Sequence, residues 1–130
     1  SLFDVAIHLK DFGEELFDRT GIALTTKGIS EDMLGTKLSM ETRRHLTLIF
    51  KEGMNNILKH AAASNVTLAV ELQNDSLRMA LSDDGKGYVN ESSAGYGLKN
   101  MQQRAEKIHS AIRFDSEPGR GSIVELILGM

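Results

Sequence analysis

Apolar residues recur along the chain at two different spacings, which mark helices and strands. In residues 2–21 they recur every three or four positions and stop at a glycine, which predicts a first helix. Residues 21–28 predict a short strand, and a polar connection fills residues 28–38. A long second helix is expected from about Ser39, its N-cap, to Ala63.

The second half of the chain is dominated by the alternating pattern of strands. Residues 65–85 contain two alternating apolar runs separated by the polar letters QNDS, which predicts a β-hairpin. A glycine-rich loop at residues 84–97 and a helix at residues 98–109 come next, and two further strands fill residues 111–128. This order predicts one α+β domain over residues 1–130, a two-layer α/β sandwich. Three helices are expected on one face of a mixed, mostly antiparallel sheet of about five strands.

Composition restricts the class of protein. The 130 residues are 41% hydrophobic and 25% charged, which is typical of a globular domain with its own core. The absence of cysteine excludes disulfides and thiolate metal sites, and no apolar run reaches the roughly 18 residues that a membrane helix needs. A net charge of −3 with 5% aromatic residues argues against nucleic-acid binding. Because the chain begins with Ser1 rather than methionine, we expect it to be a piece of a longer protein.

Four polar residues of different chemistry interrupt the apolar pattern of the second predicted helix: Glu52, Asn56, Lys59 and His60. At about 100° per residue they fall along one edge of that helix, beside its apolar face. A solvated flank with a Glu-to-Lys contact explains the pattern, because mixed polar flanks are common on amphipathic helices. A binding site for a charged ligand explains it as well, and these residues alone leave both interpretations open.

Two polar residues point toward the predicted core from strands. Asp83 continues the buried side of its strand, after apolar residues at the three preceding alternate positions. An ionised carboxylate in such a place needs hydrogen-bond donors. Asp83 therefore either caps the turn into Gly85 or accepts a hydrogen bond from an amine or amide of a ligand. Ser122 also faces the core side of its strand, directly after a tight glycine turn that fits an ordinary hairpin.

The loop between the hairpins holds Gly85, Gly87, Gly95 and Gly97, and the last two lead into a helix. A helix N-terminus with closely approaching backbone N–H groups is suited to bind phosphate. Other glycine-rich motifs do not fit. The chain has no GxxxxGK[ST] motif and no GxGxxG after a strand, and the loop lacks the acidic residues of a calcium loop.

Four motifs follow one another in a fixed order: E-x-x-x-N-x-x-K-H at residues 52–60, D-x-G-x-G at 83–87, G-x-G-L-x-x-M at 95–101 and P-G-x-G-[ST] at 118–122. Together they resemble the ATP-binding catalytic domain of sensor histidine kinases. More broadly, they resemble the ATPase superfamily shared with DNA gyrase, Hsp90 and MutL, whose fold is of the Bergerat type. The stretches FKEGMNNILKHA and GYGLKNMQQRAEKI are most similar to the subfamily whose response regulators resemble NarL. The resemblance is strong over residues 38–130.

The resemblance implies a role for each polar position. Glu52 would act as general base or orient the attacking group, and Asn56 would give its side-chain oxygen to Mg²⁺. Lys59 and His60 would reach the phosphates of ATP, and Asp83 would accept a hydrogen bond from the adenine amine. The other implied ATP-binding residues are Gly85, Gly87, Tyr88, Gly95, Gly97, Leu98, Lys99, Arg104 and Ser122.

The implied activity is transfer of the γ-phosphate of Mg-ATP to a histidine on the protein's own dimerisation domain, for relay to a NarL-like response regulator. The parent would be a bacterial homodimer, soluble or membrane-bound, with this domain in the cytoplasm. His8 lies only 44 positions before Glu52, which leaves no room for a dimerisation hairpin, so we interpret it as part of the first helix. The chain alone is not expected to phosphorylate itself. The alternatives are an anti-sigma-factor serine/threonine kinase of the same fold, and a non-catalytic nucleotide-sensing module.

Overall fold

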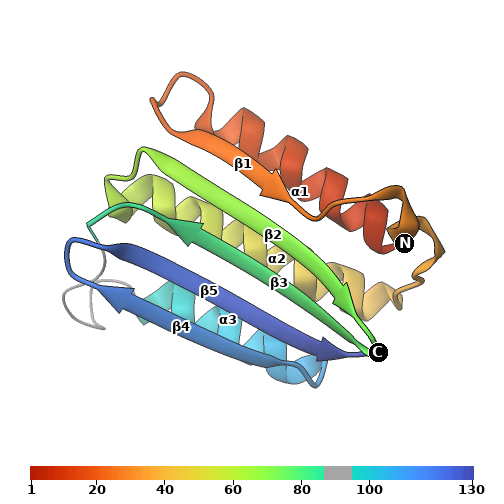
Figure 1. Cartoon of the computed structure of the whole chain (residues 1–130). Coiled ribbons are helices and arrows are strands. Elements are labelled where there is room, and N and C mark those ends of the chain that lie inside the picture. Colours follow the sequence, from red (N-terminus) through yellow and green to blue (C-terminus); the bar gives the residue numbers. More distant parts are fainter. Residues whose placement is uncertain (87–94) are drawn as a thin grey trace.

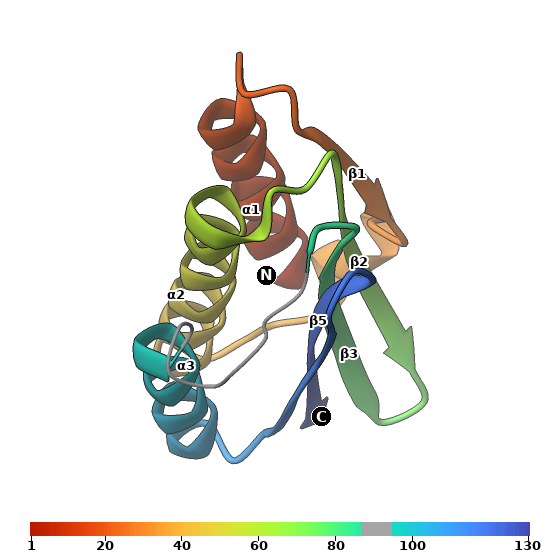
Figure 2. The same ribbon diagram turned by 90° about the vertical axis from the view of Figure 1, so that its left-hand side faces the viewer.

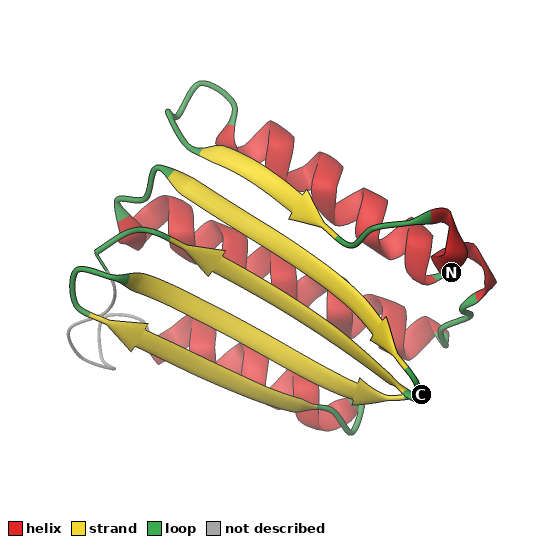
Figure 3. Cartoon of the chain, viewed as in Figure 1, coloured by secondary structure: helices red, strands yellow, loops and turns green. Residues whose placement is uncertain are grey.

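The helices and strands follow one another in the order that the sequence predicts (Figures 1 and 3). The structure is a computed structural model that describes residues 1–86 and 95–130. Its elements are α1 (Leu2–Phe17), β1 (Ala23–Lys27), the 3₁₀ turn η1 (Glu31–Gly35), α2 (Met40–Asn56), the π turn η2 (Ile57–Ala61), β2 (Asn65–Gln73), β3 (Ser76–Asp83), α3 (Gly95–Lys107), β4 (Ala111–Glu117) and β5 (Gly121–Gly129).

The strands form one sheet in the order β1-β2-β3-β5-β4. β1 runs parallel to β2 and the other neighbouring strands are antiparallel, so the sheet is mixed. The helices α1, α2 and α3 cover one face of this sheet (Figure 2). Fully buried side chains from both layers meet between them, among them Leu9, Phe50, Leu81, Met101 and Leu126. The predicted two-layer α+β fold is confirmed.

Local hydrogen bonds decide where the first two helices begin and end. The Ser39 hydroxyl accepts a hydrogen bond from the backbone N–H of Thr42 at 3.1 Å, which confirms the predicted N-cap of α2. The first helix ends earlier than its predicted stop at Gly21, since α1 ends at Phe17. There the Thr20 hydroxyl donates to the Phe17 carbonyl at 2.5 Å, and Arg19 takes a left-handed backbone conformation. No helix within residues 1–86 and 95–130 has the length and apolarity needed to cross a bilayer.

The second helix does not continue regularly to Ala63, as its periodicity suggested. α2 ends at Asn56 and passes into the π turn η2, after which Ala62 has a left-handed conformation with φ of 51°. The backbone N–H of Lys86, in the loop after β3, donates to the Ala61 carbonyl at 2.7 Å. This bond satisfies a carbonyl at the end of the helix. Because a π turn holds more residues per turn than an α-helix, the 100° wheel does not apply beyond Asn56.

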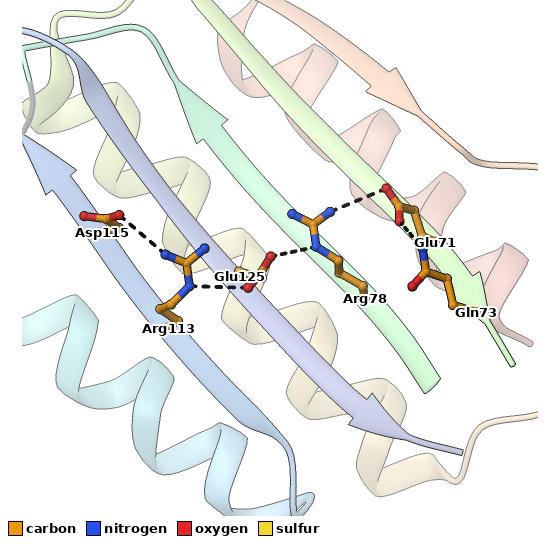
Figure 4. A network of polar contacts seen from close by, with 6 residues as sticks. All are labelled: Glu71, Gln73, Arg78, Arg113, Asp115 and Glu125. Carbon is orange, nitrogen blue, oxygen red and sulfur yellow. Dashed lines mark hydrogen bonds and ion pairs between the residues drawn. The ribbon is translucent and has the colours of Figure 1, made fainter. Parts of the chain in front are cut away.

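A row of charged side chains crosses the face of the sheet that points away from the helices (Figure 4). Arg78 on β3 lies between Glu71 on β2, at 3.5 Å, and Glu125 on β5, at 2.6 Å. Arg113 on β4 contacts the same Glu125 at 3.3 Å and Asp115 at 3.4 Å. We call these five residues the open-face network. The hydrogen bond from Arg78 is the main reason why the pKa of Glu125 lies below its ordinary value.

Candidate functional site

Asp83 occupies the last position of β3 and lies directly opposite Ser122 of β5. Only 8% of its surface is exposed. One carboxylate oxygen accepts a hydrogen bond from the Ser122 hydroxyl at 2.6 Å, and the other accepts from the backbone N–H of Gly85 at 2.8 Å. Each oxygen keeps acceptor capacity, since a carboxylate has about four lone-pair positions. Asp83 therefore caps the turn into Gly85, and its carboxylate is held in place with acceptor capacity to spare.

Gly121 lies against the backbone of Asp83 from the neighbouring strand. Its φ of +86° is a conformation that other residues rarely adopt. A Cβ atom at this position would overlap the Asp83 carbonyl oxygen and would lie 3.1 Å from the Cα atom of Asp84. Glycine is thus required at position 121 for two separate reasons, and its contact helps to fix the position of Asp83.

The loop after β3 connects Asp83 to the end of the second helix. Besides the bond from Lys86 to Ala61, the backbone N–H of Gly119 donates to the Lys86 carbonyl at 2.6 Å. A Cβ atom on Gly85 would overlap the Ala61 carbonyl oxygen, so loop and helix end are in close contact. Three segments far apart in the sequence therefore meet beside Asp83: the end of η2, this loop and the turn between β4 and β5.

Asn56 lies at the junction of α2 and η2, and its side chain is a buried polar group. It is 9% exposed, and its side-chain nitrogen Nδ2 has no hydrogen-bond partner among residues 1–86 and 95–130. A Cβ atom on Gly97, in the first turn of α3, would overlap Nδ2 of Asn56 and would lie 3.0 Å from the Cγ and Oδ1 atoms of the same side chain. A buried amide without a partner is costly, about 1–3 kcal/mol, unless a ligand satisfies it.

These groups suit magnesium and a nucleotide. The amide oxygen of Asn56 is a hard ligand of the kind that Mg²⁺ prefers, and Mg²⁺ usually takes few protein ligands beside phosphate oxygens and water. The unpartnered N–H group of Asn56 could donate to a phosphate oxygen. Asp83 complements an amine. The donor set thus matches the Mg-ATP that the sequence resemblance implies.

Glu52 lies one helical turn before Asn56, on the same side of α2. It is half-buried, and within the described part of the chain no hydrogen bond or ion pair engages its carboxylate. A carboxylate in this state is available to accept a proton or to orient an attacking hydroxyl, water or imidazole.

The other predicted residues fall into three groups. Lys59 and His60 are exposed on η2, and Lys99 is exposed on α3. Gly95 opens α3, whereas Leu98 packs against the hydrophobic core. Gly87 and Tyr88 lie outside the described residues.

The structure does not bring Arg104 to Asn56. Its guanidinium lies 3.4 Å from Nδ1 of His45, a residue of α2 about three turns before Asn56. Since Gly97 contacts Asn56 and Arg104 contacts His45, α2 and α3 run antiparallel as neighbours. His45 was not among the predicted site residues, although its spacing of four from the buried Ile49 places it on the apolar side of the helix.

Residues 41–130 match the protein family described as Histidine kinase-, DNA gyrase B-, and HSP90-like ATPase. The chain belongs to this ATPase family. The matched segment begins in the first turn of α2 and includes Glu52, Asn56, Asp83 and Ser122.

Relatives of this ATPase chain include sensor kinases. It is 32% identical over 100 residues to the sensor histidine kinase LiaS and 33% identical over 118 residues to the sensor histidine kinase LnrJ, both of Bacillus subtilis (strain 168). These alignments cover 75% and 89% of the chain but 28% of each relative, so the chain spans little more than a quarter of their length. The prediction of an ATP-binding catalytic domain of the histidine kinase type is confirmed.

Solved structures show the same fold at low sequence identity. The histidine kinase domain of the blue-light activated histidine kinase of Erythrobacter litoralis EL346 has a TM-score of 0.77 at 18% identity, over 96% of this chain and 58% of that one. The histidine kinase AdeS of Acinetobacter baumannii has a TM-score of 0.73 at 13% identity, over 98% of this chain and 64% of that one.

Proposed function

We propose that this ATPase domain binds Mg-ATP with its adenine at Asp83 and its phosphates at Asn56. As part of a longer homodimeric sensor kinase, it then transfers the γ-phosphate to a histidine on the dimerisation domain, for relay to a NarL-like response regulator. The proposal includes a bacterial parent with this domain in the cytoplasm. The observation that carries it is the buried side-chain amide of Asn56, whose Nδ2 has no partner among residues 1–86 and 95–130 and which a ligand would satisfy.

Each side chain has a separate task in this proposal. Asp83, fixed by Ser122 and Gly85, accepts a hydrogen bond from the exocyclic amine of adenine and thereby distinguishes adenine from guanine. Asn56 binds the metal through its oxygen. A metal ion held there would supply charge neutralisation on the phosphates of ATP.

Glu52 completes the chemistry, because its carboxylate lies one turn from Asn56 and can take up a proton from the attacking group or orient it. Lys59 and His60 are exposed at the adjacent helix end, where Lys59 adds positive charge near the phosphates and His60 offers a ring N–H group to them. Positioning and charge neutralisation supply most of the catalysis in phosphoryl transfer, so few protein groups are needed.

Calorimetric titration with ATP, with and without Mg²⁺, tests the binding site. We expect Asn56→Ala to remove most of the gain in affinity that Mg²⁺ gives, and Asp83→Asn to reduce the preference for ATP over GTP while it keeps the Mg²⁺ effect. Asn55→Ala is the matched control, because within residues 1–86 and 95–130 the neighbouring Asn55 side chain forms one hydrogen bond, to the Lys51 carbonyl at 3.0 Å. Equal Mg²⁺ dependence in Asn56→Ala and wild type would contradict the metal role.

A second experiment tests the class of kinase. The chain is mixed with a dimerisation domain from its parent or from a relative, together with ATP, and the product is treated with acid. Acid-labile phosphohistidine supports the proposal. Acid-stable phosphoserine would identify the serine kinase alternative, and no transfer to any partner would favour a nucleotide-sensing module.

A further inference from the structure

A groove separates the beginning of α2 from the end of α3, far from Asn56. Its volume is about 640 Å³, and its lining residues are Met40, Glu41, Arg44, His45, Arg104 and Lys107. A water molecule occupies about 30 Å³ of liquid, so the groove has room for a hydrated anion. We call it the α2–α3 groove.

Positive charge dominates this groove. Arg44, Arg104 and Lys107 face one carboxylate, that of Glu41. None of the three cations forms an ion pair with a carboxylate among residues 1–86 and 95–130, whereas the arginines of the open-face network each contact two. Local charge in the groove is therefore opposite in sign to the net charge of −3 of the chain.

His45 lies next to these cations, and their charge affects the pKa of its imidazole ring. The ring is 6% exposed, and burial lowers its pKa first, followed by repulsion from Arg104 and Lys107. Arginine can only donate, so the Arg104 contact at 3.4 Å requires that Nδ1 of His45 is the unprotonated acceptor. Nε2 lies 4.0 Å from the Glu41 carboxylate, too far for a hydrogen bond, and a neutral ring forms no ion pair there.

From these observations we propose that the α2–α3 groove binds a tetrahedral dianion, such as a phosphate group, between Arg44, Arg104 and Lys107. A phosphate oxygen suits the planar guanidinium of Arg104 better than a neutral imidazole does, because charge-assisted hydrogen bonds are stronger. When Arg104 turns to the anion, Nδ1 of His45 becomes able to take up a proton and donate to the anion as well. Binding of the anion and protonation of His45 are therefore coupled, and each favours the other.

The groups that face His45 decide the direction of this coupling. They are Glu41 and Arg44 on α2 and Arg104 and Lys107 on α3. A bound dianion offsets the three cations, so the pKa of His45 rises and the affinity for the anion increases as pH falls. The proposed function assigns none of these groove residues to the nucleotide, and Arg104, which the sequence resemblance implied for ATP, lies here instead. The two proposals can therefore be tested separately.

Nuclear magnetic resonance of the histidine rings tests the proposal with sulfate, a tetrahedral dianion that does not titrate between pH 5 and 8. The chain is titrated at constant ionic strength, with sodium chloride replacing sulfate in the reference series. We expect sulfate to raise the pH midpoint of His45. His8, His60 and His109 are exposed internal references, and His45→Gln identifies the resonance.

Variants locate the binding site. Arg104→Gln should weaken sulfate binding about tenfold or more, since hydrogen bonds to charged groups are strong. Lys107→Gln, at an exposed position where folding is not at risk, should weaken it about two- to fivefold. Arg19→Gln removes an equal charge elsewhere on the surface and should change nothing. Asn56→Ala should also leave sulfate binding unchanged, which separates this site from the nucleotide pocket.

The outcomes are distinct. An unchanged His45 midpoint in sulfate, or equal sulfate binding by wild type and Arg104→Gln, would overturn the proposal. At pH 8, where both are dianions, inorganic phosphate and glycerol 2-phosphate distinguish the source of the phosphate group. Binding of both assigns a phosphomonoester, and binding of inorganic phosphate alone assigns the free ion. Failure of both to bind would contradict a phosphate site.

Discussion

Replacement of Gly121 by alanine tests whether the close contact between β5 and Asp83 holds the candidate site together. The substitution introduces two separate costs. One is the φ of +86°, which costs an alanine about 1–2 kcal/mol, partly offset by about 0.4–1 kcal/mol because alanine restricts the unfolded chain. The other is the overlap between the new Cβ atom and the Asp83 carbonyl.

The overlap is the larger cost. The two strands must separate locally, which disturbs the neighbouring hydrogen bonds of the β3–β5 ladder next to the pair Asp83–Ser122. Loss of one or two such bonds costs about 1–3 kcal/mol each. We therefore expect Gly121→Ala to lower the free energy of unfolding by about 3–5 kcal/mol.

Two other glycines separate the contributions. Gly119 has a φ of +82°, and a Cβ atom added there would meet no other heavy atom within 4 Å, so Gly119→Ala should cost only about 1 kcal/mol. Gly28 also has a φ of +82°, and its Cβ would overlap the Val70 carbonyl, far from Asp83 in the sheet. Gly28→Ala should thus be as destabilising as Gly121→Ala, but it should leave ATP affinity unchanged.

Urea denaturation followed by circular dichroism gives the free energy of unfolding, and calorimetry with Mg-ATP gives affinity for the fraction that is folded. Gly121→Ala should lower both the free energy of unfolding and the affinity for Mg-ATP. Gly28→Ala should lower only the free energy of unfolding, and Gly119→Ala should change neither quantity much. If Gly121→Ala and Gly119→Ala were equally stable, the close approach to Asp83 would be refuted.

Three further predictions concern single side chains. Ser122→Ala removes the 2.6 Å hydrogen bond to the buried Asp83, so it should weaken ATP binding about tenfold, as followed by a fluorescent nucleotide, and should also lower the thermal midpoint. His109→Gly should stabilise the chain by about 0.5–1 kcal/mol in urea denaturation, because His109 has a left-handed φ of 56° at the end of α3. Glu125 has a lowered pKa through Arg78, so its contribution should be present above pH 4.5 and lost as pH falls through its folded pKa. The difference in stability between wild type and Glu125→Gln, about 1 kcal/mol or less at pH 7, should therefore shrink below pH 4.5 and vanish once the pH is below the folded pKa of Glu125.

Strand residues of the site could be predicted from the sequence because side-chain alternation is simple. Period two placed Asp83 and Ser122 on the core side of their strands, and the structure finds them opposite each other with a hydrogen bond between them. The alternation does not, however, predict which strands are neighbours in the sheet. The parallel partner of β1 and the order of the strands follow from packing across the whole chain.

Helix residues were harder to place. The wheel that grouped Glu52, Asn56, Lys59 and His60 assumes a regular helix, and the π turn after Asn56 invalidates it for the last two. The last residue of that turn, Ala61, accepts the bond from Lys86, a contact between segments far apart in the sequence that a single-helix pattern does not include. The partner of Arg104 likewise depends on how two helices pack, which the pattern of one helix cannot reveal.

The open-face network has a consequence for strand pairing. Apolar residues on the inner face penalise a shift of one residue between strands, because such a shift turns every side chain to the other face. A shift of two residues keeps that pattern and would be tolerated by the core alone. It would, however, move Glu125 away from Arg113, its direct partner on β4, and change its diagonal contact with Arg78. The apolar core cannot distinguish the native register from one shifted by two residues. The ion pairs on the exposed face favour the native register, although each pair contributes little.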